Sequence, residues 1–286
     1  MANKKLKAPV NIPVEKIYPF EGHPYKVLDN DEMNTLIESI QQKGVISPIV
    51  VRPLENTTEE YELISGHRRL RASVKAGLEA VPALIYAVSR DEAAIMLVDS
   101  NLHREHILPS EKAFAYKLKL EAIKRQGERT DLTSRQVVGK LESADLISEN
   151  ESGRQVQRYI RLTNLIPEIL DLVDEERIAF TPAVELSYLN EVEQADLVEE
   201  IRVCDATPNL SQAQRLRAIS REEGLTPEHI GEILAEEKAN QREKIKIPAE
   251  RIRKYFPKSY TTEQIEEAII KICESRYRAR QGRDAR

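Results

Sequence analysis

The hydrophobic pattern of this chain changes at Pro109, and that change limits the possible folds more than any other feature. Before Pro109, short runs rich in β-branched residues alternate with segments whose apolar residues recur every three or four positions. After Pro109, only the helical spacing continues. The pattern predicts an α+β domain over residues 10–108, followed by an all-α remainder of the chain.

The N-terminal part predicts strands and helices in mixed order. "VNIPVEKIYPF" reads as an edge strand or extended arm, because its prolines cannot donate hydrogen bonds inside a sheet. "NDEMNTLIESIQQKG" predicts a helix that ends at Gly44. The remaining predicted elements are the strands "SPIVVRPL", "EYELIS" and "AVPALIYAV" and the helices "RRLRASVKAGL" and "DEAAIMLVDSNL".

The helical part carries repeated signals for helix starts. A Ser or Thr followed three residues later by Gln can exchange hydrogen bonds with the first turn of a helix. This pattern occurs at Thr133–Gln136, Ser152–Gln155, Ser211–Gln214 and Thr261–Gln264. Linkers are expected at Asn190–Glu193, Cys204–Asn209 and Asn240–Lys246. The predicted domains are therefore residues 10–108, 109–190 and 191–286.

Composition narrows the class of protein. The longest purely apolar run, Ala93–Val98, is far too short to cross a membrane, and no export signal follows the first lysines. Cys204 and Cys273 are distant from each other and form no paired motif. These features favour a cytoplasmic protein without a membrane partner. The net charge of −5 is weak evidence against nucleic-acid binding, because the basic residues are clustered locally.

The stretch "ISGHRRLRA" (residues 64–72) places a glycine and several cations where a strand passes into a helix. Gly66 would let the backbone approach a ligand closely, and the free amides of a helix start attract anions. Arginines in a first helical turn oppose the helix dipole unless an anion is near. The alternative is a solvated basic helix face, with Leu70, Val74 and Leu78 packed inward.

A second polar motif lies in "SNLHREHILPSEKA". Asn101 and Arg104 are three residues apart, so both point the same way on a helix. An arginine can pair with phosphate oxygens in a fork, while an asparagine can bind a phosphate or the water shell of a cation. The alternative is a polar helix end before Pro109.

Together, these motifs make the chain resemble the ParB-type partition proteins over roughly residues 10–190. In that family, Gly-Glu-Arg-Arg and Glu-Asn-x-x-Arg motifs enclose the triphosphate of CTP with magnesium, and a Gly-x-x-x-Pro stretch lies near the base. The resemblance implies a nucleotide site with Mg²⁺ near Asn101. The matching residues are Gly44, Ile46, Pro48, Gly66, His67, Arg68, Arg69, Asn101 and Arg104.

Two positions depart from the family pattern. His67 and Ser100 stand where the family has glutamates, which are the groups suited to holding magnesium or polarising water. The chain is therefore expected to be at most a weak CTPase. Such variants resemble ParB-like proteins of conjugative and other mobile elements. A metal site formed by His67, His103 and His106 is a further alternative, although no acidic or Cys ligand accompanies these histidines.

The segment "LTSRQVVGKLESADLISENESGRQVQRYIRLTNLIPEIL" predicts a helix-turn-helix. A first helix over Thr133–Leu141 would precede a second helix capped by Ser152, whose inward face holds Val156, Tyr159 and Ile160. Arginine and glutamine are suited to reading bases or contacting phosphates. The expected DNA-binding residues are Arg154, Gln155, Gln157, Arg158 and Arg161. The alternative is an ordinary helical hairpin with a solvated face.

The leading hypothesis is a DNA partition protein whose N-terminal domain senses CTP and controls self-association on DNA. The resemblance implies double-stranded DNA, a second copy in a homodimer and a ParA-type ATPase as partners, and a location at the nucleoid. Two alternatives are a ParB-like transcriptional regulator without nucleotide switching, and an enzyme such as a nuclease or a kinase. The C-terminal residues predict amphipathic helices and a basic tail.

Overall fold

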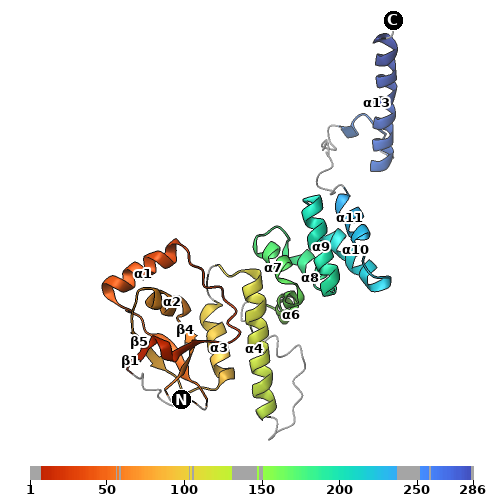
Figure 1. The fold of residues 1–286 in the computed structure, drawn as a ribbon. Helices are drawn as coiled ribbons and strands as arrows, with labels where there is room; N and C mark the ends of the chain where they lie inside the picture. Colours follow the sequence, from red (N-terminus) through yellow and green to blue (C-terminus); the bar gives the residue numbers. More distant parts are fainter. Residues whose placement is uncertain are drawn as a thin grey trace. The chain divides into compact units, whose positions relative to one another are not determined.

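A computed structural model describes residues 8–55, 57, 59–102, 104, 106–130, 147, 151–236, 252–257 and 259–284. The chain forms two compact units, Met1–Glu236 and Glu237–Arg286. Figure 1 shows the first unit as a sheet domain followed by helices, which confirms the predicted fold class.

The N-terminal domain is built on a mixed five-stranded sheet. Its order is β1-β5-β3-β4-β2, in which β1/β5 and β3/β4 are antiparallel and β5/β3 and β4/β2 are parallel. The strands are β1 (Val10–Pro13), β2 (Ile17–Pro19), β3 (Ile49–Pro53), β4 (Tyr61–Ser65) and β5 (Ala80–Ile85). A 3-10 turn, η1 (Val14–Lys16), joins β1 to β2. The two strands formed by the predicted edge segment "VNIPVEKIYPF", β1 and β2, lie at the two edges of the sheet, as the sequence predicts.

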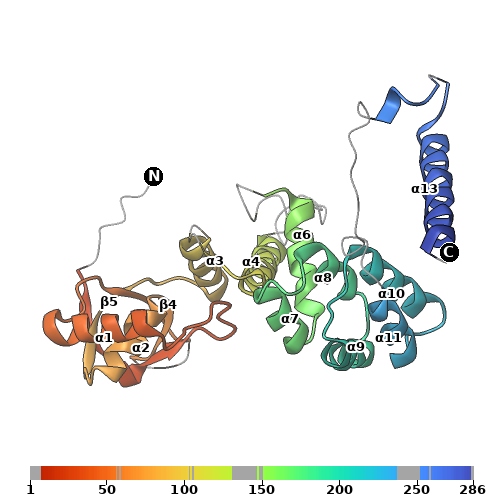
Figure 2. The same ribbon diagram turned by 90° about the horizontal axis from the view of Figure 1, so that it is seen from above.

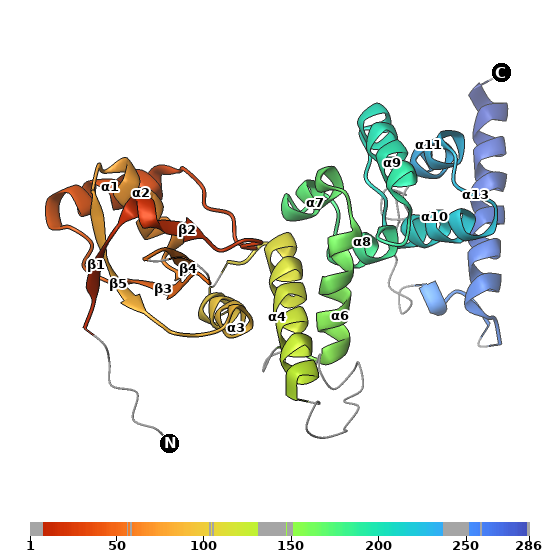
Figure 3. The same ribbon diagram turned by 60° about the horizontal axis from the view of Figure 1, so that its bottom comes forward.

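Side chains of the central strands point alternately to the two faces of the sheet, and helices cover both faces. Leu63 and Val51 face one cluster with Leu70 of α2 (His67–Lys75), and α1 (Asp31–Lys43) packs on α2. Ile64 faces the other cluster, with α3 (Arg90–Asn101). Figure 3 shows α1 and α2 on one side of the sheet and α3 on the other. The period-two side-chain alternation of a strand produces this layering.

The helical part of the first unit continues directly from α3. Ala115 and Ala122 of α4 (Pro109–Thr130) share a buried cluster with α3. The next elements are α6 (Gly153–Arg161), η2 (Leu162–Asn164), α7 (Pro167–Asp174), α8 (Phe180–Leu186), α9 (Glu191–Cys204), α10 (Leu210–Glu222) and α11 (Pro227–Ala235). One hydrophobic cluster includes side chains from Ala113 to Leu234, and Figure 2 shows these helices gathered together. The core therefore extends past residue 190.

Two sequence predictions in this region are wrong. The Asn190–Glu193 segment is not a linker, because Asn190 caps α9 and exchanges hydrogen bonds with Glu193. Helix α10 is capped by Asn209 with Gln212, two residues earlier than the predicted Ser211. The predicted cap at Ser152 is confirmed. The predicted helix over Thr133–Leu141 and the linker at Asn240–Lys246 lie outside the described residues.

The second unit contains α13 (Thr262–Asp284). Its start is confirmed as a capping box, because the Thr261 amide donates to Gln264 Oε1 at 2.9 Å and the Gln264 amide donates to Thr261 Oγ1 at 3.3 Å. Among the described residues, no helix has the length and apolar character needed to cross a membrane.

Candidate functional site

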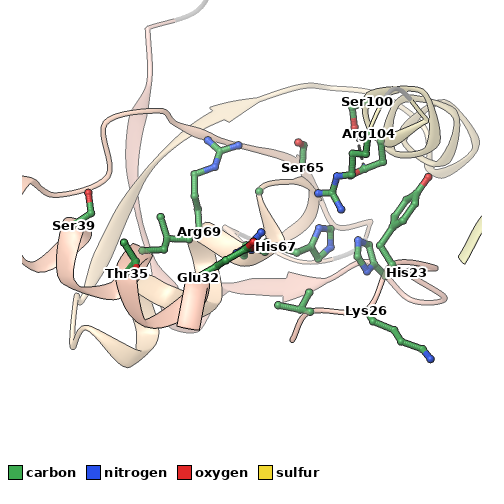
Figure 4. Close-up of a pocket in the computed structure, with 16 residues that line it drawn as sticks. His23, Lys26, Glu32, Thr35, Ser39, Ser65, His67, Arg69, Ser100 and Arg104 are labelled. Atoms are coloured by element: carbon green, nitrogen blue, oxygen red, sulfur yellow. Dashed lines mark hydrogen bonds and ion pairs between the residues drawn. The ribbon is translucent and has the colours of Figure 1, made fainter. Parts of the chain in front are cut away.

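A polar cavity of about 600 Å³ brings the two predicted anion-binding motifs together. It is lined by α1, α2, the end of α3 and the loop between β2 and α1 (Figure 4). Six of the nine residues predicted for nucleotide binding line it: Gly66, His67, Arg68, Arg69, Asn101 and Arg104. Residues far apart in the sequence therefore converge on one site.

Gly66 sets the geometry where β4 passes into α2. It is the N-cap of α2 and has φ 103°, a left-handed conformation that disfavours residues with a side chain. A Cβ atom here would also lie 2.8 Å from Cγ2 of Ile49. The glycine thus lets the strand turn sharply, and the helix begins at His67 beside the cavity. In α2, Leu70 packs inward as expected, but Val74 is exposed.

Arg69 links α2 to the loop that follows α1. Its Nη1 donates to the carbonyl oxygens of Ser47 and Pro48, each at 2.6 Å, and partial burial lowers its pKa. The three residues predicted in and around this loop, Gly44, Ile46 and Pro48, do not line the cavity. Gly44 ends α1 with φ 68°, and Ile46 is 78% exposed. The Gly-x-x-x-Pro stretch therefore borders the site through the contact of Pro48 with Arg69.

Arg68 and Arg104 reach the cavity from different elements. Arg68 forms an ion pair of 3.0 Å with Glu32 of α1. Arg104, just beyond α3, lies over the ring of Tyr25 with 5.5 Å between its Cζ and the ring centroid. Among the described residues, neither Arg69 nor Arg104 forms an ion pair with a carboxylate, so both guanidinium charges are available to an anion.

The polar residues at the end of α3 are held by their own helix. The Asn101 amide nitrogen donates to the Leu97 carbonyl at 2.7 Å and to Ser100 Oγ at 3.2 Å. The Ser100 hydroxyl also donates to the Leu97 carbonyl, at 2.9 Å. Asn101 is 7% exposed, so most of it is packed inside the domain. These contacts fix both residues at the cavity wall.

Two histidines stack at the centre of the site. The rings of His23 and His67 have centroids 3.6 Å apart and planes inclined by 31°. Burial, with smaller contributions from His23 and Arg104, lowers the pKa of His67 to about 3. Burial, with a smaller contribution from Arg104, lowers the pKa of His23 to about 4. Both rings are therefore neutral at physiological pH.

The metal alternative gains no support from the described residues, among which no group of three or more His, Cys, Asp or Glu side chains could hold a metal ion. His106 is exposed and lies away from the cavity lining. His103, the third histidine of that alternative, lies outside the described residues.

Helix α6 carries the predicted DNA-binding residues. Val156, Tyr159 and Ile160 face a cluster with α4, as predicted. Arg154 is exposed, and Gln157 is partly exposed. Among the described residues, neither side chain forms a hydrogen bond or an ion pair, so α6 offers both to a ligand.

The other predicted side chains of α6 contact neighbouring residues. Arg158 donates to Gln155 Oε1 at 3.1 Å and to Thr181 Oγ1 at 3.2 Å. Arg161 donates to the Ser187 carbonyl at 3.2 Å and lies over Tyr188. Three of the five residues are thus partly committed within the molecule.

Sequence reasoning missed several residues of the cavity, chiefly His23, Tyr25, Lys26 and Glu32. Three of them lie in the loop between β2 and α1, where no periodic pattern marks a function. The one available signal was the Gly-His-Pro-Tyr turn in "FEGHPYK", which places two ring-bearing polar residues beside a helix start.

The family model and the similar proteins both point to one protein family. Residues 2–102 match the ParB N-terminal domain model. A nucleoid occlusion protein of Listeria innocua is 33% identical over 193 residues, which cover 67% of this chain and 62% of the relative. The chromosome-partitioning protein Spo0J of Thermus thermophilus is 32% identical over 169 residues, which cover 59% and 56%. The chain thus spans about three fifths of the length of these relatives.

The C-terminally truncated ParB of Caulobacter crescentus appears in two solved structures. The one complexed with CTP-gamma-S has 23% identity and a TM-score of 0.32, and covers 68% of this chain and 99% of that chain. The one complexed to the centromeric parS site has 20% identity and a TM-score of 0.41, and covers 73% and 98%.

Proposed function

Because the chain belongs to the ParB-type partition proteins, we propose that it is a nucleoid-associated protein that binds double-stranded DNA and whose N-terminal cavity binds CTP. In this proposal the nucleotide controls how copies of the chain associate on DNA. A homodimer and a ParA-type ATPase are the expected protein partners.

The observation that carries the nucleotide proposal is the shared cavity. Arg69 and Arg104 come from separate motifs, line the same 600 Å³ space and form no ion pair with a described carboxylate. Guanidinium groups bind phosphate oxygens through paired, charge-assisted hydrogen bonds. The start of α2 adds amide groups that favour an anion. A polyphosphate fits this combination of charges and donors.

The proposal for DNA rests on α6 and its neighbours. The exposed Arg154 and the partly exposed Gln157 supply side chains that contact phosphates or base edges. Arg158 and Arg161 are steadied by α8 and the residues just after it, which would hold this helix face in a fixed orientation for a groove.

Hydrolysis is expected to be slow or absent. The two positions that carry glutamate in the family are His67 and Ser100 here, and the Ser100 hydroxyl is engaged with the Leu97 carbonyl. Glu32, the one carboxylate among the described residues of the cavity, is paired with Arg68. Among the described lining residues, no carboxylate is therefore free to polarise a water molecule beside the phosphates.

CTP-dependent crosslinking on DNA tests the proposal. Single cysteines would be placed in the N-terminal domain, and crosslinking between copies would be measured with and without CTP. We expect CTP to increase crosslinking and Arg104→Ala to remove that increase. Arg90→Ala is the matched control, because Arg90, the first residue of α3, also has its guanidinium over an aromatic ring, Phe20, but lies outside this cavity.

The regulator without nucleotide switching predicts a different result. Its DNA footprint and its crosslinking would be identical with and without CTP, for the unsubstituted chain and both variants. That outcome would retain DNA binding and remove the nucleotide switch.

A further inference from the structure

The stacked pair His23 and His67 occupies the place where the two cationic motifs meet, and neither sequence reasoning nor the family pattern assigns His23 a role. The two rings come from different elements, the loop before α1 and the first residue of α2. Their centroid separation of 3.6 Å places both imidazoles in one contact. Nε2 of His67 is buried and has no hydrogen-bond partner among the described residues. Figure 4 shows the pair between Arg69 and the end of α3.

The donor set of the cavity does not suit the magnesium ion that the family resemblance implies. Mg²⁺ in nucleotide sites is usually held by one or two carboxylates together with phosphate oxygens. Here Glu32 is the one carboxylate among the described lining residues, and it is paired with Arg68. Asn101 and Ser100 direct their donor groups to the Leu97 carbonyl, and the oxygens that they could offer a metal are neutral. The cavity offers cations and imidazoles where a metal requires anionic oxygens.

We propose that this cavity binds a polyphosphate without a metal ion, and that His23 and His67 take up a proton on binding and become part of the phosphate-binding surface. The inference rests on the proposed nucleotide site and specifies its ligand as the metal-free polyanion. The imidazolium then supplies the positive charge that a magnesium ion would supply in a site rich in carboxylates. Nε2 of His67 becomes a donor to a phosphate oxygen.

The charges around the pair support proton uptake in the complex. In the free protein, burial and Arg104 keep the pKa of both imidazoles low, at about 3 for His67 and about 4 for His23. A polyphosphate would neutralise Arg104 and place negative charge beside the rings, which raises their pKa. Four further charged side chains line the cavity: Arg69, the ion-paired Arg68 and Glu32, and Lys26. The Tyr25 ring stands edge-on to His23, and its own pKa is raised by burial.

The ammonium group of Lys26, which also lines the cavity, acts weakly on the pair. Figure 4 shows Lys26 directed away from the rings, and its ammonium pairs with Asp174 at 3.1 Å.

Proton uptake on binding makes the affinity for the polyphosphate depend on pH. This affinity should rise as pH falls through the histidine pKa values of the bound state. It should level off between about pH 4 and pH 3, where His23 and then His67 of the free protein become protonated.

Calorimetry of the full chain with CTP tests the inference. Titrations would be run at pH 6, 7 and 8, with Mg²⁺ or with EDTA, and in two buffers of different ionisation enthalpy. We expect equal affinity with Mg²⁺ and EDTA, net proton uptake, and affinity that increases by up to about tenfold per pH unit for each proton bound. Inorganic triphosphate should behave in the same way, because the proposed contacts are to phosphate.

Variants separate the histidines from the ligand's own titration, because a terminal phosphate also gains a proton near pH 6. The double variant His23→Gln/His67→Gln should bind with little proton uptake and a flat or reversed pH profile. His106→Gln, an exposed histidine outside the cavity, should behave like the unsubstituted chain. His67→Glu should make binding depend on Mg²⁺.

Two results would overturn the inference in different ways. Binding that requires Mg²⁺ and involves no proton uptake would retain the nucleotide site and reject the metal-free mode. Absence of binding of both CTP and triphosphate at every pH would reject the proposed nucleotide function as well. The comparison of Mg²⁺ with EDTA is made on the unsubstituted chain, so the test of the metal-free mode holds even if a variant fails to fold.

Discussion

At the scale of single residues, Gly66 determines whether the site can form. Its backbone has φ 103°, and Ile49 leaves no space for a side chain. The residues on either side, Ser65 and His67, belong to β4 and α2. The cavity therefore depends on one residue type at the junction of a strand and a helix.

Gly66→Ala should destabilise the N-terminal domain by about 1–3 kcal/mol, because both backbone strain and a contact of 2.8 Å with Ile49 Cγ2 oppose the new methyl group. Urea unfolding monitored by circular dichroism measures this change. Gly77→Ala is the control: Gly77 has φ 78° but no atom within 4 Å of a new Cβ. Equal losses for the two variants would show that the contact with Ile49 contributes nothing.

The histidine pair should make stability depend on pH. The folded-state pKa of His23 and His67 lies below the unfolded value of about 6.5, so the unfolded chain binds more protons. Stability is fully present above pH 6.5 and falls as pH decreases toward 4, by at most about 1.4 kcal/mol per pH unit for each histidine. Unfolding midpoints of the unsubstituted chain and His23→Gln/His67→Gln at pH 5 and 7.5 measure this. Identical pH dependence in the two proteins would exclude the pair as its source.

At the scale of elements, α6 has two kinds of polar residue. Arg154 is exposed, whereas Arg158 and Arg161 contact α8 and the residues that follow it. Truncation of an exposed arginine removes only the contact of that side chain with a ligand. Arg158 also holds Gln155 and Thr181, so its removal changes the helix surface itself.

For DNA binding, Arg158→Ala should reduce affinity for a specific site by about 1–3 kcal/mol if Arg158 contacts a base. Arg154→Ala should weaken binding to all sequences alike and reduce the salt slope by about one unit if Arg154 contacts a phosphate. Fluorescence anisotropy over a range of salt concentrations separates these effects. The control is Arg202→Ala, an exposed arginine near the end of α9 that pairs with Glu199. Unchanged binding by both α6 variants would show that another surface contacts DNA.

Sequence patterns predicted the elements of the sheet domain because its strands and helices have clear periods and stops, such as Gly44 after α1. They failed where two signals overlapped. Asn209 and Ser211 both precede a glutamine at capping distance, and the structure uses Asn209. Asn190 resembled a loop residue, yet its exchange with Glu193 begins α9. Both errors concern which polar residue starts a helix.

At the scale of the whole molecule, the net charge does not indicate where cationic side chains gather. The chain carries −5 overall, yet the cavity has guanidinium groups from two motifs that form no ion pair with a described carboxylate. The sequence drew attention to those motifs because each lies beside the end of a regular element, at the junction of β4 with α2 and at the end of α3. It could not predict that the loop before α1 folds over them and adds His23, since this contact joins segments with no shared pattern.

Equilibrium binding of CTP to the full chain tests the central claim most directly, with Arg104→Ala and Arg90→Ala measured beside the unsubstituted protein. The account predicts saturable binding at one site per chain, a loss of about tenfold or more for Arg104→Ala because a charge-assisted hydrogen bond to phosphate is removed, and no change for Arg90→Ala. Absence of saturable binding, or equal affinity in all three proteins, would contradict it.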